Sequence, residues 1–132
     1  MATGDTVLTE DSLTRRPDGL AVALTLPWYR SLWLSSVSDL AVRIDGRPVP
    51  NDQLRVELGE RVFTVDELRD QWDVLWFIQD RLVVVVPVAE PPAGGELVDV
   101  EVTVALRLPY MQIAPQVYVP NHATNRRQLV AR

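Results

Sequence analysis

The sequence contains no cysteine and no lysine, and its only histidine is His122. Without cysteine the chain has no disulfide framework, no thiolate nucleophile and no thiolate ligand for a metal. The lack of lysine excludes a catalytic lysine of any kind. Serine–histidine catalysis, or a zinc site built from several imidazoles, would depend on His122 alone. These absences indicate a chain that does little chemistry by itself, although a site made only of carboxylates stays open.

Positive charge and long apolar runs are also scarce. The 132 residues include 13 basic and 18 acidic side chains, so the net charge is −5, which argues against binding to nucleic-acid phosphates or anionic lipids. The longest apolar run, residues 82–86, is too short to span a bilayer. Residues 1–11 contain no basic side chain and no apolar core, so they predict neither a secretory signal nor a membrane anchor. We therefore expect a soluble cytoplasmic protein.

Apolar and polar residues alternate along much of the chain, which is typical of strands with one buried face. The alternation is strict over residues 98–108 and recurs at 20–26, 37–44 and 53–58. Residues 82–86 are apolar on both sides, as in a central strand covered on both faces. The pattern predicts an all-β fold: one antiparallel β-sandwich domain of about seven or eight strands, spanning residues 1–132.

The turn residues agree with this fold. Asp45-Gly46 favours a tight hairpin, and Pro48 and Pro50 then indicate a loop or a sheet edge. We expect residues 1–17 and 121–132 to be tails that are flexible or bound to a partner, since the segment after Pro120 is polar.

One segment has a helical signal. Thr64 and Glu67 have the spacing of a capping box, and Asp66 complements the start of a helix. The pattern stops near Trp72, so the helix has two turns at most. We expect the neighbouring aromatic residues to seat this helix on the sheet rather than to stack on a substrate: Trp72, Trp76 and Phe77.

The most unusual segment, residues 26–34, reads Leu-Pro-Trp-Tyr-Arg-Ser-Leu-Trp-Leu and has neither a strand period nor a helix period. Tryptophan, tyrosine and arginine dominate protein interfaces, because they bury a large area and keep a polar group. The same side chains suit stacking on a sugar or a flavonoid ring. The alternative is that they close one end of the sandwich core.

Two further groups of residues are candidates for chemistry. An acidic cluster could supply a general acid and base if its pKa values were separated, but such residues are also expected at the start of a solvated helix: Asp66, Glu67, Asp70 and Asp73. Calcium binding would need converging oxygens and loop glycines, which this cluster lacks. His122 is interpreted as a surface residue, or as a tail residue that reaches into a partner's active site.

Several motifs together resemble the beta subunit of bacterial C-glycoside deglycosidases. The resemblance depends mainly on Leu-Pro-Trp-Tyr-Arg-Ser-Leu at residues 26–32, followed by Leu-Ser-Ser at 34–36. Similar features follow in order: Ile44-Asp45-Gly46, Val65-Asp66-Glu67-Leu68 with Trp72, a valine-rich strand, and Pro109-Tyr110. The likeness covers residues from about 19 to 110.

The resemblance implies a small β-sandwich subunit that pairs with a larger alpha subunit in a hetero-oligomer. That alpha subunit is similar to a sugar-phosphate isomerase barrel and carries a divalent metal, usually manganese. The complex is a lyase of carbohydrate metabolism, which cleaves the carbon–carbon bond of C-glycosyl flavonoids or related C-glycosides after the sugar is oxidised to its 3-keto form. The ketone acidifies the proton at C2, a metal can hold the enediolate, and elimination expels the aglycone with help from a general acid.

In this division of labour the chain has no catalytic residue and binds no cofactor or metal. It would support the alpha subunit and wall part of the aglycone pocket. The expected partner-facing residues are Trp28, Tyr29, Arg30, Ser31 and Trp33, then Tyr110 and Tyr118, with His122 as a contact from the tail.

Other functions stay open. A free-standing carbohydrate-binding β-sandwich could stack Trp28 and Trp33 on sugar rings. A structural module could mediate homo-oligomers only. A self-sufficient glycosidase would have to use Asp66 or Asp70.

Overall fold

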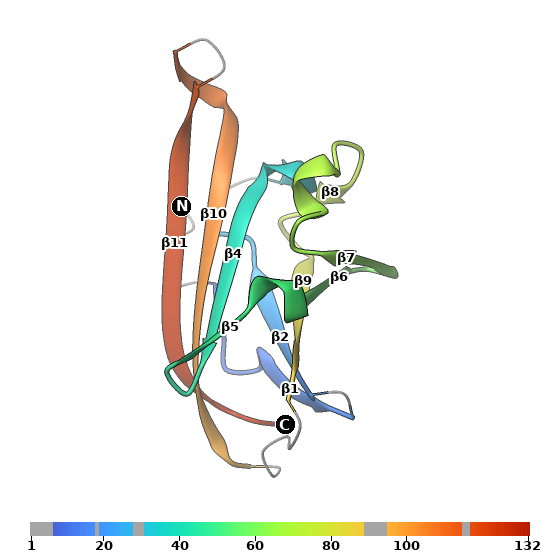
Figure 1. Cartoon of the computed structure of the whole chain (residues 1–132), viewed down its shortest axis with the longest axis vertical. Coiled ribbons are helices and arrows are strands. Elements are labelled where there is room, and N and C mark those ends of the chain that lie inside the picture. The colour runs from blue at the N-terminus through green and yellow to red at the C-terminus, as the bar shows by residue number, and fades with distance from the viewer. Residues whose placement is uncertain (1–6, 18, 28–30, 89–94, 115–116) are drawn as a thin grey trace.

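Strands form most of the computed structural model (Figure 1). It describes residues 7–17, 19–27, 31–88, 95–114 and 117–132, and the side chains of these except for residues 108–121. All strand pairs in this part of the chain are antiparallel. The predicted all-β, antiparallel sandwich class is confirmed.

Two larger sheets and one small sheet build the fold. The first sheet has the order β1 (Leu13–Arg16), β2 (Gly19–Thr25), β9 (Arg81–Pro87), β6 (Arg55–Leu58) and β7 (Arg61–Thr64). The second sheet has the order β11 (Val117–Val130), β10 (Leu97–Ala114), β4 (Val37–Ile44) and β5 (Arg47–Val49). The small sheet pairs β3 (Leu32–Trp33) with β8 (Leu75–Trp76).

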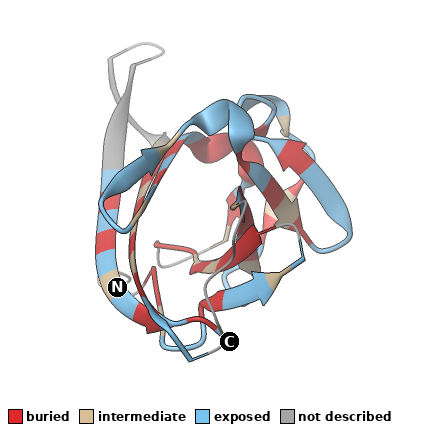
Figure 2. Ribbon diagram, turned by 60° about the horizontal axis from the view of Figure 1, so that its bottom comes forward, coloured by how far each residue is buried: buried red, intermediate tan, exposed pale blue. Residues whose placement is uncertain are grey.

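The apolar residues of the alternating strands form the hydrophobic core. In β10 the side chains of Val98, Val100, Val102 and Val104 are buried, and Figure 2 shows buried residues recurring along the strands of both larger sheets. Val84 of β9 is fully buried in the same cluster. Burying one such side chain stabilises the fold by about 1.5–3 kcal/mol, so these inward stripes hold the sheets together.

The predicted hairpin and sheet edge are both present. Asp45 and Gly46 have φ angles of 51° and 80°, the left-handed pair that a two-residue turn between antiparallel strands requires. The next strand, β5, lies at the edge of the second sheet and contains Pro48. An edge strand tolerates proline because one side of its backbone has no neighbour to bond.

The capping box also forms, and the helix that follows it stays within the predicted limit of two turns. The backbone N–H of Thr64 donates to Glu67 Oε1 (2.9 Å), and the N–H of Glu67 donates to Thr64 Oγ1 (3.3 Å). Only one turn of 3₁₀-helix follows, η4 (Leu68–Asp70), because the backbone is no longer helical at Gln71.

Some short elements were not expected. Two further 3₁₀ turns in the described chain are η2 (Leu34–Ser36) and η3 (Asn51–Gln53). The described residues hold eleven strands instead of seven or eight. The additional strands include β3, β5 and β8, which have two or three residues each and are too short to show an alternating pattern.

Residues 7–17 are built into the fold, which differs from the tail expected over residues 1–17, of which residues 1–6 lie outside the described chain. Val7 and Leu8 are buried. Thr25 of the first sheet donates its N–H to the carbonyl of Val7 (3.0 Å), and Leu8 donates its N–H to Asn125 Oδ1 of the second sheet (2.7 Å). The segment therefore bridges the two sheets.

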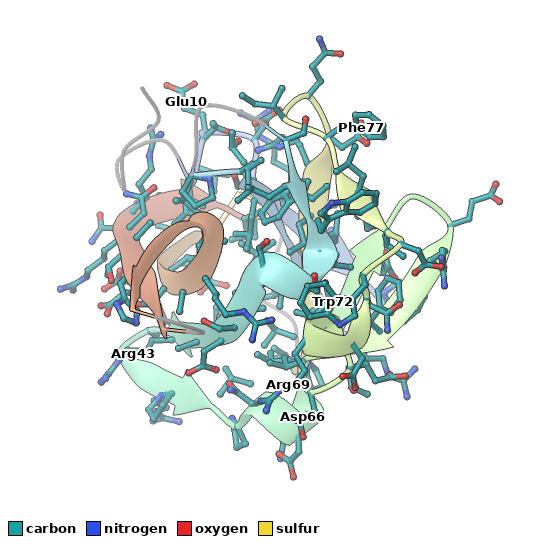
Figure 3. The ribbon with its side chains drawn as sticks, turned by 90° about the horizontal axis from the view of Figure 1, so that it is seen from above. Glu10, Arg43, Asp66, Arg69, Trp72 and Phe77 are labelled. Carbon is teal, nitrogen blue, oxygen red and sulfur yellow. The ribbon has the colours of Figure 1, made fainter. Side chains whose placement is uncertain are left out.

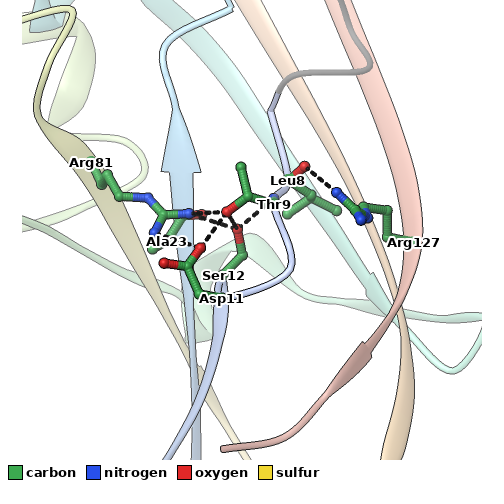
Figure 4. Close-up of polar contacts among 7 residues, drawn as sticks. All are labelled: Leu8, Thr9, Asp11, Ser12, Ala23, Arg81 and Arg127. Atoms are coloured by element: carbon green, nitrogen blue, oxygen red, sulfur yellow. Dashed lines mark hydrogen bonds and ion pairs between the residues drawn. The ribbon is translucent and has the colours of Figure 1, made fainter.

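Arg81 fastens the same segment to the first sheet (Figure 4). Its Nη2 group donates to Thr9 Oγ1 at 2.7 Å and to Ser12 Oγ at 2.9 Å, and its Nη1 group donates to Asp11 Oδ1 at 3.1 Å. From the second sheet, Arg127 Nη1 donates to the carbonyl of Leu8 (3.2 Å). The side chains of Thr9, Asp11 and Ser12 are thus bonded to Arg81 of strand β9.

The C-terminal segment likewise differs from the expected tail over residues 121–132, because residues 121–130 lie in β11. Of its described buried side chains only Leu129 is large and apolar, whereas Ala123 is small and Asn125 is polar, so its sequence lacks the strong alternation of a hydrophobic strand. Pairing with β10 runs from Leu97 opposite Val130 to Ala114 opposite Val117. The end of this hairpin extends beyond the rest of the molecule (Figure 1).

Within the described residues, no helix has the length and apolar character needed to cross a bilayer.

Candidate partner-binding surface

The small β3–β8 sheet places one tryptophan inside the molecule and another outside. Leu32 lies opposite Trp76, and Trp33 lies opposite Leu75. Leu32 and Trp76 are buried, and successive strand residues point to opposite faces. Trp33 therefore faces solvent, and 47% of its surface is exposed.

The chain after η4 runs beside this segment and adds more exposed apolar groups. Leu34 donates its N–H to the carbonyl of Val74 (2.7 Å), Ser35 donates to Gln71 (3.1 Å), and Ser31 Oγ accepts a bond from the N–H of Ile78 (2.9 Å). These bonds tie residues 31–35 to residues 71–78 along their length.

Four large apolar side chains of these two segments are exposed: Trp33 at 47%, Trp72 at 62%, Phe77 at 53% and Ile78 at 40%. We call this group the aromatic end. Figure 3 views the molecule from this end and shows Trp72 and Phe77 on it. The other exposed large apolar side chains in the described chain are Val62, Leu97 and Val130. A gathering of exposed apolar groups of this kind usually marks an interaction site.

Arg107 of β10 connects the aromatic end to the long hairpin. Its guanidinium carbon lies 5.4 Å from the centroid of a Trp72 ring. The same side chain donates from Nη2 to the carbonyl of Ser35 (3.2 Å). Arg107 therefore contacts both segments of the aromatic end.

The expectation that Trp72, Trp76 and Phe77 seat a helix on the sheet is wrong for Trp72 and Phe77, and only Trp76 lies inside the molecule. Trp76 is buried and donates its Nε1–H to the carbonyl of Asp80 (2.9 Å). Trp72 and Phe77 are exposed. The reason is the early end of η4 at Asp70, which leaves Trp72 in a turn instead of on a helix face.

Trp72, Phe77 and Ile78 were not predicted to be surface residues. A signal was available, because Gln79-Asp80 marks a turn immediately after Phe77 and Ile78. Large apolar residues beside a turn are poor candidates for a strand interior.

The predicted partner-facing residues divide into three groups. Ser31 and Trp33 lie at the aromatic end. Trp28, Tyr29 and Arg30 lie outside the described residues. Tyr110 and Tyr118 have their backbones in β10 and β11, but their side chains lie outside the description. The structure thus brings Ser31 and Trp33 together with three residues that had not been predicted.

His122 is exposed in β11, opposite Ala105 of β10. It lies in the strand and not in a tail. The contact with a partner's active site that we considered for it stays a prediction.

The acidic cluster is exposed on the surface around η4: Asp66, Glu67, Asp70 and Asp73. Glu67 accepts the capping bond from Thr64, which is the ordinary role of an acidic residue at the start of a helix. Among the described residues, no three His, Asp or Glu side chains come together as ligands for one metal ion.

A paired set of charges lies on the second sheet. Arg126 contacts Asp99 through Nε and Nη2, with an Nη2–Oδ2 distance of 2.6 Å. This bonding by Arg126 holds the pKa of Asp99 below its ordinary value. Arg43, Glu101 and Arg126 lie in register across β4, β10 and β11. Alternating charges across neighbouring strands stabilise a sheet, so this row has a structural explanation.

Comparison with known proteins points to one family. The model of the C-glycoside deglycosidase beta subunit family matches residues 6–110. A C-glycoside deglycosidase beta subunit from Arthrobacter globiformis is 45% identical over 130 residues, which cover 98% of each chain. A 3'-dehydrocarminate deglycosidase beta subunit from a Microbacterium species is 32% identical over 108 residues, 82% of this chain and 80% of the relative. A C-glycoside deglycosidase beta subunit from Microbacterium trichothecenolyticum is 38% identical over 110 residues, 76% of this chain and 77% of the relative.

Proposed function

The chain belongs to the C-glycoside deglycosidase beta subunit family, and on this basis we propose that it is the non-catalytic beta subunit of a hetero-oligomeric lyase. The complex cleaves the carbon–carbon bond between a 3-keto sugar and an aromatic aglycone by elimination, and we place it in the cytoplasm. Its alpha subunit is a barrel of the sugar-phosphate isomerase type, which holds a divalent metal, manganese by preference.

The observation that carries this proposal is the 45% identity to a beta subunit over 98% of both chains. A match of that length includes both sheets, the β3–β8 segment and the hairpin. The composition supports the division of labour, since metal binding and proton transfer usually employ histidine and carboxylates that converge on one point. This chain has a single histidine.

A metal ion bound to the alpha subunit would hold the enediolate that forms when the proton at C2 of the sugar is removed. Among the described residues, no three His, Asp or Glu side chains gather where they could hold a metal ion together. We therefore assign the metal and the acid–base groups to the alpha subunit. The role of this chain is to stabilise that subunit and to wall part of the aglycone pocket.

Co-expression with the adjacent reading frame tests the proposal. The expected result is a complex that co-purifies and releases aglycone from a 3-keto-C-glycoside, with no turnover by either chain alone. Turnover by the isolated chain would overturn the non-catalytic role. A chain that is monodisperse and stable alone, and that does not associate with the barrel protein, would overturn the subunit assignment.

A carbohydrate-binding module is the second candidate, favoured by the exposure of Trp33. Exposed indole rings can stack on sugar rings. Isothermal titration of the isolated chain with simple glycosides separates the two functions. Binding that is lost in both Trp28→Ala and Trp33→Ala would support the module, whereas the subunit proposal expects no binding by the chain alone.

A further inference from the structure

We infer that the alpha subunit docks on the aromatic end of this chain, beside the projecting β10–β11 hairpin. The docking surface of the alpha subunit is apolar and is bordered by basic side chains. This inference rests on the proposed function and adds to it the face and the chemistry of the contact. The inference depends on the position of four exposed side chains on two hydrogen-bonded segments at one end of the molecule: Trp33, Trp72, Phe77 and Ile78.

The apolar character of this end needs an explanation. Three of its four exposed side chains are aromatic: Trp33, Trp72 and Phe77. Tryptophan and other aromatic residues are enriched in the energetically important centres of interfaces. The backbone bonds between residues 31–35 and 71–78 hold these side chains on one framework, so little ordering is required when a partner binds.

The hairpin makes the surface continuous with a second element. Leu106 is buried, and the next residue, Arg107, contacts both Trp72 and Ser35. Beyond this point the hairpin extends past the β3–β8 end (Figure 1). A partner seated on the aromatic end therefore meets the hairpin as well.

The charge around the aromatic end indicates which charge the partner's surface must carry. Asp70 and Asp73 lie on either side of Trp72 in the sequence, Asp80 lies two residues after Ile78, and all three are exposed. They outnumber the two arginines nearby, which are Arg69 of η4 and Arg107. The matching surface needs lysine or arginine at its rim. A second copy of this chain would bring the same acidic groups against one another, and each copy carries a net charge of −5. Charge complementarity therefore favours the alpha subunit over self-association.

A pair of double variants tests the apolar part in the co-expressed complex. Trp72→Ala with Phe77→Ala removes two exposed aromatic groups of the aromatic end. Leu97→Ala with Val130→Ala is the matched control, because these residues lie opposite each other near the other end of the hairpin and Leu97 is as exposed as Trp72, at 61% and 62%. We expect the first pair to raise the dissociation constant for the alpha subunit at least tenfold, and the control to leave it within twofold.

A second pair tests the charge. Asp70→Arg with Asp73→Arg should slow association severalfold at low salt, and added salt should reduce the difference because it screens rim charges. Asp52→Arg with Glu60→Arg makes the same change in net charge on exposed residues of η3 and the β6–β7 turn, and it should have the smaller effect.

Hydrogen–deuterium exchange on the wild-type complex gives a measurement that does not depend on variants. The inference expects amide protection of residues 71–78 on assembly and none at residues 55–64. Protection of 55–64 alone would overturn it, as would equal binding by the Trp72→Ala, Phe77→Ala variant. A homodimer of the isolated chain that is lost in this variant would identify a second copy as the occupant and overturn it too. Failure of the wild-type chain to bind the barrel protein is a different result, which overturns the proposed function itself.

Discussion

The guanidinium carbon of Arg107 lies 5.4 Å from the centroid of a Trp72 ring. A cation held over an indole face is attracted by the negative potential of the ring. Arg107 belongs to β10, and Trp72 follows η4, so this contact joins the hairpin to the segment that carries two of the exposed aromatic residues. The hydrogen bond from Arg107 to the carbonyl of Ser35 reinforces the connection.

Replacing Arg107 should therefore affect both stability and assembly. Arg107→Met keeps an unbranched side chain but removes the cation and the hydrogen bond, and we expect the free energy of unfolding to fall by about 1–2 kcal/mol. Urea unfolding measures this loss.

Arg61→Met is the matched control, because the Arg61 guanidinium carbon lies 5.3 Å from the Phe63 ring in the first sheet. The control should lose about 0.5–1 kcal/mol of stability without weakening association. Equal binding of the alpha subunit by both variants would contradict the proposed link between Arg107 and assembly.

The two tryptophans that follow η4 should respond differently to truncation. Trp76 is almost fully buried, so Trp76→Ala should lower the free energy of unfolding by about 3–5 kcal/mol. Trp72 is exposed, and Trp72→Ala should cost about 1 kcal/mol, mostly from its contact with Arg107. Urea unfolding followed by circular dichroism gives both values.

Trp76→Phe keeps the measurement possible if the alanine variant does not fold. It retains an aromatic ring but leaves the carbonyl of Asp80 without its donor from Nε1, so a loss of about 1–3 kcal/mol is expected. Similar losses for Trp72→Ala and Trp76→Ala would show that the assignment of one tryptophan to the core and one to the surface is wrong.

Strands β10 and β9 could be predicted from their own residues. In β10 the buried residues from Val98 to Val104 recur at every second position, and in β9 the continuous apolar run indicates a strand in the middle of its sheet. The turn at Asp45-Gly46 and the capping bonds of Thr64 and Glu67 could also be predicted, since they depend on local chemistry. These features need no knowledge of distant parts of the chain.

The remaining features depend on contacts between distant residues. The strand at residues 121–130 exists because β10 supplies its partner, and its own sequence is polar. Leu8 is held by Asn125, 117 residues away. Trp72 and Phe77 became surface residues because η4 ends early and the chain turns to pair with β3. No local pattern reports the contacts that expose Trp72, whereas the turn at Gln79-Asp80 is a local signal for Phe77 and Ile78.

Gly19 occupies a position that no larger residue can fill without distortion. Its φ angle is +143°, and a Cβ atom built on it would lie 2.1 Å from the carbonyl oxygen of Val86. Gly19→Ala should therefore lower the free energy of unfolding by about 3 kcal/mol, through backbone strain and the forced separation of β2 from β9.

Gly59→Ala is the control for this substitution. Gly59 has a φ angle of +62°, but a Cβ there meets open space, so only the left-handed conformation costs energy, about 1–2 kcal/mol. Urea unfolding of both variants separates strain from steric overlap. A loss for Gly19→Ala no larger than that for Gly59→Ala would show that the close approach of the two strands is not rigid.

The acid stability of the protein should depend in part on Asp11. Its pKa is lowered from the ordinary value of 3.8, first by the hydrogen bond from Thr9 and then by the charge of Arg81. Since the unfolded chain protonates this carboxyl at a higher pH than the folded chain, the stabilisation is complete well above pH 3.8. The stabilisation is lost as the pH falls below 3.8 and through the lower pKa of the folded state.

We expect Asp11→Asn to destabilise the protein at pH 7. The difference in stability between Asp11→Asn and the wild type should shrink as the pH is lowered towards 2.5. Glu10→Gln removes the neighbouring exposed carboxylate, leaves the bonds to Arg81 in place, and should show no such trend. Urea unfolding at several pH values measures both variants, and a difference for Asp11→Asn that stays constant from pH 7 to 2.5 would contradict the role of its charge in holding the N-terminal segment.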